Sequence, residues 1–226
     1  MTPKASPDKR KRLPRGARKA RIIQDAARHF AANGFAATTR ELAADMGITQ
    51  ALLYRYFSSK EDLIDQVFQT VFIDRWKPEW DDILADRTLT PSARLIRFYE
   101  GFLGSVSYVS LRLFMRSALD GMNFPERYTF SLNDRVLTPV IAGLRDAAGL
   151  PNFQERPFFD EERELTVMLH GSLVFTRIRK FIYDTPLPDD AGPMVALHVE
   201  TYLPGALQHL KRLHTQAPPG KLGRGA

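Results

Sequence analysis

The feature that most constrains the fold is a run of helix signals in residues 34–63, where helix starts and a glycine stop follow closely on one another. Thr38 and Glu41 stand three residues apart, the spacing of a capping box in which a hydroxyl and a carboxylate bond each other's backbone N–H groups. Gly47 supplies the left-handed backbone that ends a helix, and Thr49 then caps a second, short helix. Two helices joined by so short a turn predict a helix-turn-helix.

Two further helices complete this unit. Apolar residues recur at three- and four-residue steps from residue 18 to residue 33, and Gly34 follows as a stop, which predicts a first helix. The helices of the turn are expected at about residues 38–46 and 50–56. Ser58 and Glu61 form a second capping box that starts a longer helix, and Phe35 and Phe57 are expected to close the small core.

The unit ends in a Tyr-x-x-Phe-x-x-Lys-x-x-Leu pattern formed by Tyr54, Phe57, Lys60 and Leu63, after a helix that ends in a Gly-aromatic pair and a threonine-rich cap. With these spacings, residues 18–64 resemble the DNA-binding domain of the TetR family of bacterial transcriptional regulators. The resemblance implies a sequence-specific, ligand-responsive regulator, in most cases a repressor that a small molecule releases from a palindromic operator. One sequence does not distinguish a repressor from an activator.

The resemblance also assigns roles to residues, because it places the N-terminal half of the second helix of the turn in the major groove of DNA. Gln50 is the best candidate for reading adenine, and Arg40 for reading guanine. Ala51 and Leu52 are expected to contact thymine methyl groups. The candidates for phosphate contacts are Thr38, Thr39, Thr49, Tyr54, Tyr56 and Lys60, and Arg55 suits either role. The alternatives are that the tyrosine rings pack the small domain and that the threonines serve mainly as caps.

Beyond residue 63 the apolar pattern is helical and contains no alternating run typical of a strand, so the whole chain is predicted to be all-α. The expected helices are 59–76, 79–85, 90–102, 108–119, 126–148, 160–183 and 191–213. The predicted organisation is a basic arm at 1–17, the DNA-binding domain at 18–64, a helical ligand-binding and dimerisation domain at 65–213 and a flexible tail at 214–226.

The last two long helices carry many apolar residues. They are Leu165, Leu169, Leu173, Ile178, Phe181, Val195, Val199, Tyr202, Leu203, Leu207 and Leu210. The resemblance implies that these helices form a four-helix bundle in a homodimer, whose twofold symmetry matches a palindromic operator. On periodicity alone, packing within one subunit explains the same pattern equally well.

The middle of the body is rich in aromatic residues and methionine, which are side chains that line apolar cavities. The resemblance implies a small apolar or aromatic effector held between body helices. The candidate pocket residues are Phe98, Tyr99, Phe102, Phe114, Met115, Met122, Met168, His170 and Phe175, and Arg112, Arg116 and Asn123 are further polar candidates. Ordinary core packing is the alternative for each of them.

Positive charge is concentrated at the N-terminus. Residues 1–21 carry nine basic side chains and one acid, whereas residues 22–210 carry 19 basic and 25 acidic side chains. DNA is therefore expected to meet the N-terminal end. A segment rich in proline, lysine and arginine cannot bury enough apolar area to fold alone, but it suits phosphates or a minor groove. A solubilising tail is the alternative.

Composition and missing motifs argue against other classes. The absence of cysteine excludes thiol catalysis and thiolate zinc sites, the five histidines are scattered, and no metal or cofactor is expected. No phosphate loop, dinucleotide-binding glycine pattern, nucleophile elbow or HExxH pattern occurs, so an enzyme is not expected. Without a membrane span or secretory signal, the protein is expected in the bacterial cytoplasm, on the nucleoid when bound to DNA.

Two binding classes remain as rivals to a sequence-specific regulator. A nonspecific nucleic-acid binder explains the basic arm but not the ordered presentation of Gln50 and Arg40. A pure ligand-binding or protein-interaction module would bind no DNA at all.

Overall fold

The computed structural model describes residues 14–216, in which the chain forms only helices and connecting turns, as predicted. Four helices and a π-helical turn form one end: α1 (Arg15–Asn33), α2 (Thr39–Asp45), α3 (Gln50–Tyr54), α4 (Lys60–Phe68) and η1 (Gln69–Ile73). The rest comprises α5 (Pro78–Ala85), α6 (Pro91–Gly104), α7 (Tyr108–Leu119), α8 (Phe124–Leu132), η2 (Asn133–Leu137), α9 (Thr138–Ala148), α10 (Asp160–Phe181) and α11 (Gly192–Gln216). We call α1–α4 the head and α5–α11 the body.

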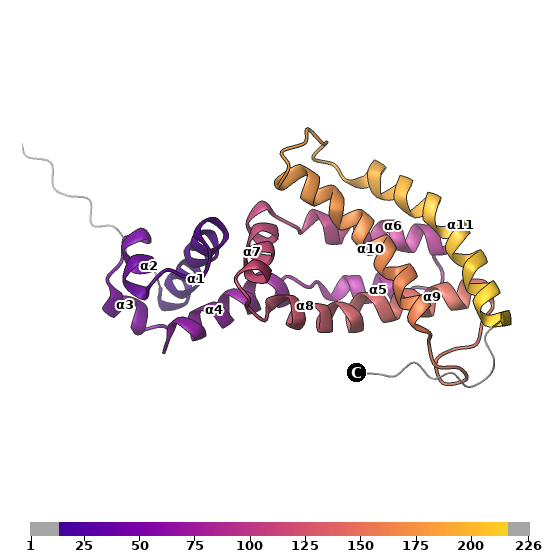
Figure 1. Ribbon diagram of the computed structural model, residues 1–226, viewed down its shortest axis with the longest axis horizontal. Helices are drawn as coiled ribbons and strands as arrows, with labels where there is room; N and C mark the ends of the chain where they lie inside the picture. The colour runs from indigo at the N-terminus through magenta and orange to yellow at the C-terminus, as the bar shows by residue number, and fades with distance from the viewer. Residues whose placement is uncertain (1–13, 217–226) are drawn as a thin grey trace, which may run out of the picture.

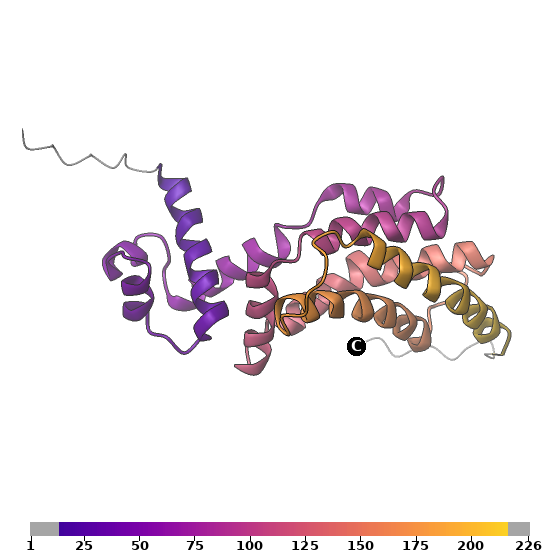
Figure 2. The ribbon, with the colours of Figure 1, turned by 90° about the horizontal axis from the view of Figure 1, so that it is seen from above.

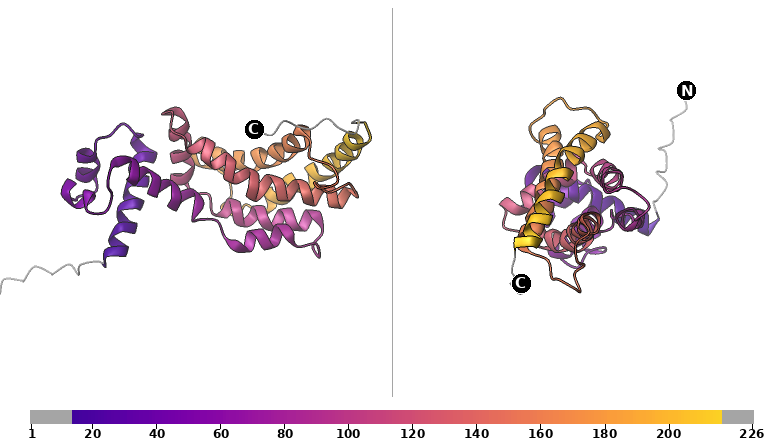
Figure 3. Two further views of the ribbon diagram at one scale, coloured as in Figure 1. Left: turned by 90° about the horizontal axis from the view of Figure 1, so that it is seen from below. Right: turned by 90° about the vertical axis from the view of Figure 1, so that its right-hand side faces the viewer.

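Head and body lie end to end in an elongated molecule (Figure 1). The chain passes from the head into the body through α4 and η1, and α7 stands across the junction beside α1 (Figure 2). In the body, α10 and α11 run along each other, and α5 and α6 lie on another side of the helical stack (Figure 3). Helices α1–α3 of the head and the helical body agree with the predicted architecture.

Most helix starts follow the sequence signals. Thr90 caps α6 by accepting a hydrogen bond from the N–H of Ala93, and Pro91 occupies the first turn, where its missing N–H has no cost. Ser107 caps α7 through the N–H of Ser110. The predicted capping box of Ser58 and Glu61 was wrong by one residue.

Ser59 is the residue that caps α4. Its hydroxyl accepts from the N–H of Asp62 at 3.1 Å, while the N–H of Ser58 donates to the Asp62 carboxylate at 2.8 Å. Ser58 and Glu61 stand three residues apart, and so do Ser59 and Asp62. Both pairs therefore have the spacing of a cap, and only the backbone conformation decides which of them forms it.

Both ends of the predicted helical region also need correction. α1 begins at Arg15, so the predicted arm of residues 1–17 extends too far, and its first 13 residues lie outside the described part of the chain. α11 continues to Gln216, past the predicted tail start at residue 214, because His214 is buried. Pro204 lies inside α11 without dividing it.

Two predicted long helices contain a π-helical turn. The helix predicted at 59–76 is α4 followed by η1, which ends at Ile73, and that predicted at 126–148 is α8, η2 and α9. Pro139 lies in the first turn of α9, directly after η2. A wider turn before a proline accommodates its ring and its missing N–H without breaking the helix.

A buried ion cluster closes the end of the body that is remote from the head. Arg145 donates to both carboxylate oxygens of Glu162, at 2.8 and 2.6 Å, and both side chains are almost fully buried. His214 of α11 lies 3.0 Å from the same carboxylate. The other N–H groups of the guanidinium donate to the carbonyl oxygens of Pro151, Arg156 and Pro157. The cluster thus ties α9, α10, α11 and the 149–159 loop together.

Burial alone raises the pKa of Glu162, but hydrogen bonds from Arg145 and His214 outweigh burial and hold the pKa below its ordinary value. The ionised carboxylate therefore stabilises the fold at neutral pH. This contribution is lost as the pH falls from the pKa of an unfolded glutamate, about 4.3, through the lower folded-state pKa.

Substituting Arg145→Met is expected to lower the free energy of unfolding by about 3–5 kcal/mol, because it leaves the Glu162 charge buried without its partner. Urea denaturation at neutral pH measures the loss. The matched control is Arg87→Met, whose guanidinium lies 3.5 Å from Asp146 on an exposed side chain and whose loss is expected to cost less than about 1 kcal/mol. Equal effects of the two substitutions would contradict this account.

Candidate nucleic-acid interface and ligand cavity

The helix-turn-helix is formed by α2 and α3. Thr38 accepts from the N–H of Glu41, and the Glu41 carboxylate accepts from the N–H of Thr38 at 2.7 Å, which confirms the predicted capping box. Gly47 has φ +63° in the tight turn, and Thr49 caps α3 through the N–H of Leu52. Leu42 and Leu53 are buried where the two helices meet, so the opposite side of α3 faces solvent.

A chain of three side chains crosses the outer surface between α2 and α3. The Gln50 amide nitrogen donates to the Thr39 hydroxyl at 2.9 Å, and this hydroxyl lies 3.1 Å from the Tyr54 hydroxyl. These hydrogen bonds fix the orientation of the Gln50 side chain on the surface of α3. Sequence reasoning chose all three residues separately, but it did not foresee that they bond to one another.

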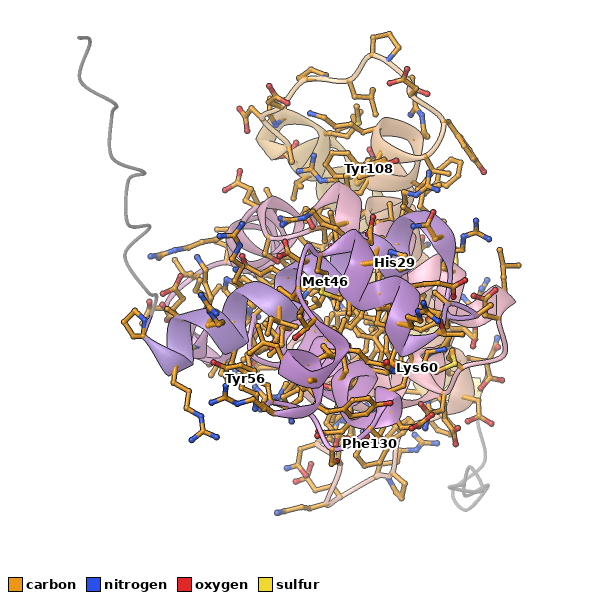
Figure 4. All side chains as sticks on the ribbon, turned by 90° about the vertical axis from the view of Figure 1, so that its left-hand side faces the viewer. His29, Met46, Tyr56, Lys60, Tyr108 and Phe130 are labelled. Atoms are coloured by element: carbon orange, nitrogen blue, oxygen red, sulfur yellow. The ribbon has the colours of Figure 1, made fainter. Side chains whose placement is uncertain are left out.

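The other predicted DNA-contacting residues divide into two groups. Thr38, Arg40, Thr49, Ala51 and Arg55 are exposed. Leu52 and Tyr56 are half-buried, and the Tyr56 ring packs against the head core next to Phe57. Figure 4 looks onto the head and shows Met46, Tyr56 and Lys60 around its short helices.

Lys60 has a contact inside the protein. Its ammonium group donates to the carbonyl oxygen of Phe35 at 2.5 Å, so it ties the start of α4 to the connection between α1 and α2. His29 adds a second tie, because its Nδ1 lies 2.8 Å from the Asp45 carboxylate at the end of α2. These contacts fix α2 and α3 relative to α1.

The head and the body share one core at the junction of α1 and α7. As predicted, Phe35 and Phe57 are buried, and the Phe35 ring stacks on Phe30 with centroids 4.8 Å apart. Phe35 also meets Phe124 of α8 edge to face at 5.5 Å. Since Phe124 contacts Phe68 and Phe72 as well, α4, η1, α8 and the end of α1 meet around one ring.

Polar contacts fix the same junction. The N–H of Phe35 donates to the Asp120 carboxylate at 3.0 Å, and Arg112 of α7 donates to the carbonyl oxygen of Ala31 at 3.1 Å. On the other side, Arg127 of α8 donates to Asp65 of α4 at 2.7 Å. Asp120 carried no recognisable signal in the sequence, because its partner lies 85 residues away.

A cavity of about 240 Å³ lies in the body next to this junction. Its lining comes from the η1 region and from α6, α7, α8 and α10, and it is mostly apolar. The lining residues are Phe72, Arg75, Phe102, Val106, Ser110, Leu111, Phe114, Tyr128, Thr129, Leu132, His170, Gly171 and Val174.

Only part of the predicted pocket lies in this cavity. Phe102, Phe114 and His170 line it, whereas Phe98 and Tyr99 are buried in the core beside it. Met115, Arg112, Arg116 and Asn123 are outside the lining, and Met122 packs against the head core. Met168 and Phe175 are exposed on α10 and were wrong as pocket residues, because helix rotation turns them away from His170.

The cavity has few polar groups. Burial, together with the nearby positive charge of Arg75, lowers the pKa of His170 to about 4, so its ring is neutral at pH 7. Its Nδ1 lies 3.5 Å from the Tyr99 hydroxyl. Burial raises the pKa of Tyr128, although the positive charge of Arg75 opposes the shift. No sequence pattern indicated that Arg75 lines a cavity, because it lies just after η1 and reaches the cavity only through the packing of distant helices.

On the two helices predicted to form the dimer interface, the exposed apolar residues are not the ones that the sequence indicated. Leu169, Leu173, Val195, Val199 and Leu210 are buried within the subunit, so core packing explains them. A different set of apolar side chains is exposed on the same two helices: Val167, Met168 and Phe175 on α10, and Leu197 on α11.

Within residues 14–216, none of the helices is long and apolar enough to cross a membrane. The same part of the chain contains no group of three or more His, Asp or Glu side chains arranged to hold a metal ion.

The geometry of α2 and α3 defines the head as a helix-turn-helix domain of the class that binds DNA. Residues 22–67 match the family model described as "Bacterial regulatory proteins, tetR family". The head therefore carries a DNA-binding domain of the TetR type.

Similar proteins agree with this assignment. The chain is 37% identical over 79 residues to the HTH-type transcriptional repressor KstR2 of Mycobacterium tuberculosis, a match that covers 34% of this chain and 38% of that repressor. The matched stretch thus spans well under half of this relative. The family and this relative are transcriptional regulators, not enzymes.

Solved structures resemble the fold over most of its length. A TetR-like transcriptional regulator from Rhodococcus sp. RHA1 superposes with a TM-score of 0.65 at 23% identity, covering 86% of this chain and all of that one. A putative transcriptional regulator from Pseudomonas aeruginosa PAO1 gives 0.63 at 17% identity, covering 89% and 95%. At such identities the likeness concerns the fold.

Gly34→Ala is expected to destabilise the head by about 1–3 kcal/mol. Gly34 has φ +79° and ψ −171°, a region that L-residues rarely adopt, and an added Cβ would lie 2.7 Å from the Asp120 carboxylate. Chemical denaturation measures the loss. The control, Gly16→Ala, lies in α1 with no atom within 4 Å of the added Cβ and is expected to be neutral or stabilising. A Gly34→Ala protein as stable as the wild type would contradict the prediction.

Proposed function

We propose that this protein is a homodimeric, sequence-specific transcriptional repressor that binds a palindromic operator and is released from it by a small apolar molecule in the body cavity. The observation that carries the proposal is the outer face of α2 and α3. There Gln50 is exposed and held by Thr39, while Leu42 and Leu53 are buried behind it.

The exposed residues suit the two tasks of a DNA-binding surface. Gln50 and Arg40 carry amide and guanidinium groups that pair with adenine and guanine edges, and Ala51 offers a methyl group for thymine. Thr38, Thr49 and Arg55 are exposed around them and suit phosphates. When α3 enters the groove, the Thr39 and Tyr54 hydroxyls can exchange their mutual contact for phosphate oxygens. Leu52 and Tyr56 remain candidates through their exposed edges.

Lys60 is the weakest of the proposed phosphate ligands. Its hydrogen bond to the Phe35 carbonyl must be kept or exchanged when DNA binds. We assign it mainly to positioning α4 and the α1–α2 connection beneath the DNA-binding face.

The proposed dimer interface is the exposed stripe on α10 and α11. Met168, Gly171 and Phe175 follow one another at three- and four-residue steps along α10, which places them on one side of the helix. Ser172 of this side lies 3.0 Å from His198 Nδ1 of α11, and the neighbouring Leu197 is 58% exposed. Large apolar side chains gathered on two adjacent helices are typical of a subunit interface.

Release from DNA is proposed to follow from the position of the cavity. Phe72 belongs to η1, which continues the head helix α4, and Phe114 belongs to α7, which holds α1 through Arg112. An effector that contacts both side chains shifts the two elements that orient the head. Two heads must fit grooves about 34–36 Å apart, so a small rotation is enough to separate one head from its half-site.

Gln50→Ala is expected to weaken binding to the selected operator by about 1–3 kcal/mol and to relax the choice at one base pair, because one bidentate contact is lost. Operators are first selected from genomic fragments, and affinities are then measured by fluorescence anisotropy on the operator and on a random duplex. Gln208→Ala, an exposed glutamine of α11, is the control and should bind like the wild type.

Equal losses on both duplexes would remove Gln50 from base reading and favour a nonspecific nucleic-acid binder. Failure of the wild type to bind any genomic fragment would instead favour a ligand-binding or protein-interaction module.

Phe175→Glu is expected to shift the dimer towards monomers, because it places a charge in the apolar stripe, at a cost of about 2 kcal/mol or more. Light scattering during gel filtration over a range of micromolar concentrations measures the shift. Leu119→Glu, an 81% exposed position on α7, is the matched control and should leave the mass unchanged. A monomeric wild type, or an unchanged dimer in the Phe175→Glu protein, would contradict this interface.

A further inference from the structure

We propose that the body cavity binds an apolar monocarboxylic acid, with the carboxylate on Arg75 and the hydrocarbon part against the aromatic and aliphatic wall. The inference rests on the proposed effector role of this cavity and specifies the chemistry of its ligand.

The first observation is the charge of the lining. Among the described residues of the lining, Arg75 is the one that is charged at neutral pH, since no aspartate or glutamate of residues 14–216 contributes to it and burial keeps His170 neutral. A positive charge in an otherwise apolar wall favours a ligand that brings one negative charge, because pairing compensates the loss of hydration. The wall and the cation together therefore select an amphiphilic anion.

The second observation is how Arg75 is held. Its guanidinium lies over the Phe102 ring, 5.1 Å from the centroid, and near the Tyr128 hydroxyl, where its positive charge opposes the rise in the pKa of that tyrosine. Within residues 14–216 it forms no ion pair, and the carboxylate of the adjacent Asp74 accepts from Gln69 at 2.7 Å. A guanidinium has five N–H donors in a planar fork, so most of this donor set is available for a carboxylate.

The neutral polar groups of the lining do not favour a cationic or an uncharged ligand over an anion. The Ser110 hydroxyl is occupied in the α7 cap, where it donates to the Ser107 carbonyl at 3.0 Å. Tyr128 can donate its hydroxyl to a carboxylate oxygen beside Arg75, and burial keeps that hydroxyl protonated. An amine would be repelled by Arg75, and an alcohol would leave the cation uncompensated.

The size of the cavity sets the scale of the acid. At about 240 Å³ it lies below the usual range of ligand pockets, roughly 300–1,000 Å³, so it suits a medium-length chain or a single aromatic system. An organic phosphate is disfavoured, because it carries up to two negative charges against one arginine. Decanoate is therefore an appropriate probe, with decan-1-ol and decylamine as matched neutral and cationic probes.

The test measures binding of the three probes to the full chain by isothermal titration calorimetry at neutral pH. For the wild type, decanoate is expected to bind about tenfold or more tightly than decan-1-ol, and decylamine more weakly still. Arg75→Met should weaken decanoate binding about 10- to 100-fold and leave decan-1-ol binding unchanged. Arg75→Lys should give an intermediate loss, because it keeps the charge but not the planar fork.

The matched control is Arg135→Met. Arg135 lies over the Trp76 ring at 5.2 Å in the same part of the body, but it does not line the cavity. The substitution removes the same charge and should leave binding of all three probes unchanged. Far-ultraviolet circular dichroism verifies that each variant is folded, and the comparison of the three probes on the wild type decides the question if Arg75→Met does not fold.

The inference is overturned if decanoate does not bind, if the acid and the alcohol bind equally well, or if Arg135→Met weakens the acid as much as Arg75→Met does. Failure of the proposed function has a different signature, because operator binding is measured separately. Decanoate that binds through Arg75 but leaves the operator complex intact would support the carboxylate site and reject ligand-induced release. If decan-1-ol and decanoate bind with equal affinity and both release the operator, ligand-induced release is supported and the carboxylate site is rejected.

Discussion

The shared core between the α1–α2 connection and the end of α7 is the constraint on which the remaining structure depends. Phe35 stacks on Phe30 inside the head and meets Phe124 of the body, while its N–H is bonded to Asp120. The left-handed Gly34 brings the chain to this contact. Because one residue completes the small core of the head and also anchors it to the body, the orientation of α3 is tied to the packing of α7 and α8.

The cavity lies between the elements that carry the head and the core of the body. Phe72 and Phe114 face it from the two elements that carry the head, and Phe102 and His170 close it from the body core. Apolar interiors are close-packed, so a ligand that fills such a space is expected to displace the helices around it. The far end of the body is fixed by the buried cluster of Arg145 and Glu162, so the displacement is expected at the junction.

Sequence reasoning succeeded where the signal is local. The Thr38–Glu41 box, Gly47, the Thr49 cap and the Thr90–Pro91 start depend on residues within one or two turns, and the structure confirms each of them. It failed where two local solutions compete, as at Ser58 and Ser59. It also failed where rotation of a helix decides the outcome, since Met168 and His170 are two residues apart but one is exposed and the other faces the cavity.

The sequence by itself determined the helical class of the chain and the helix-turn-helix, because caps, turns and apolar periodicity are short-range properties. Only the tertiary structure decided which aromatic residues surround the cavity, that Arg75 lines it without an ion pair to any residue of the described part of the chain, and that Asp120 holds Phe35. The physical reason is that these depend on how helices distant in sequence rotate and pack against one another, and no local pattern records that geometry.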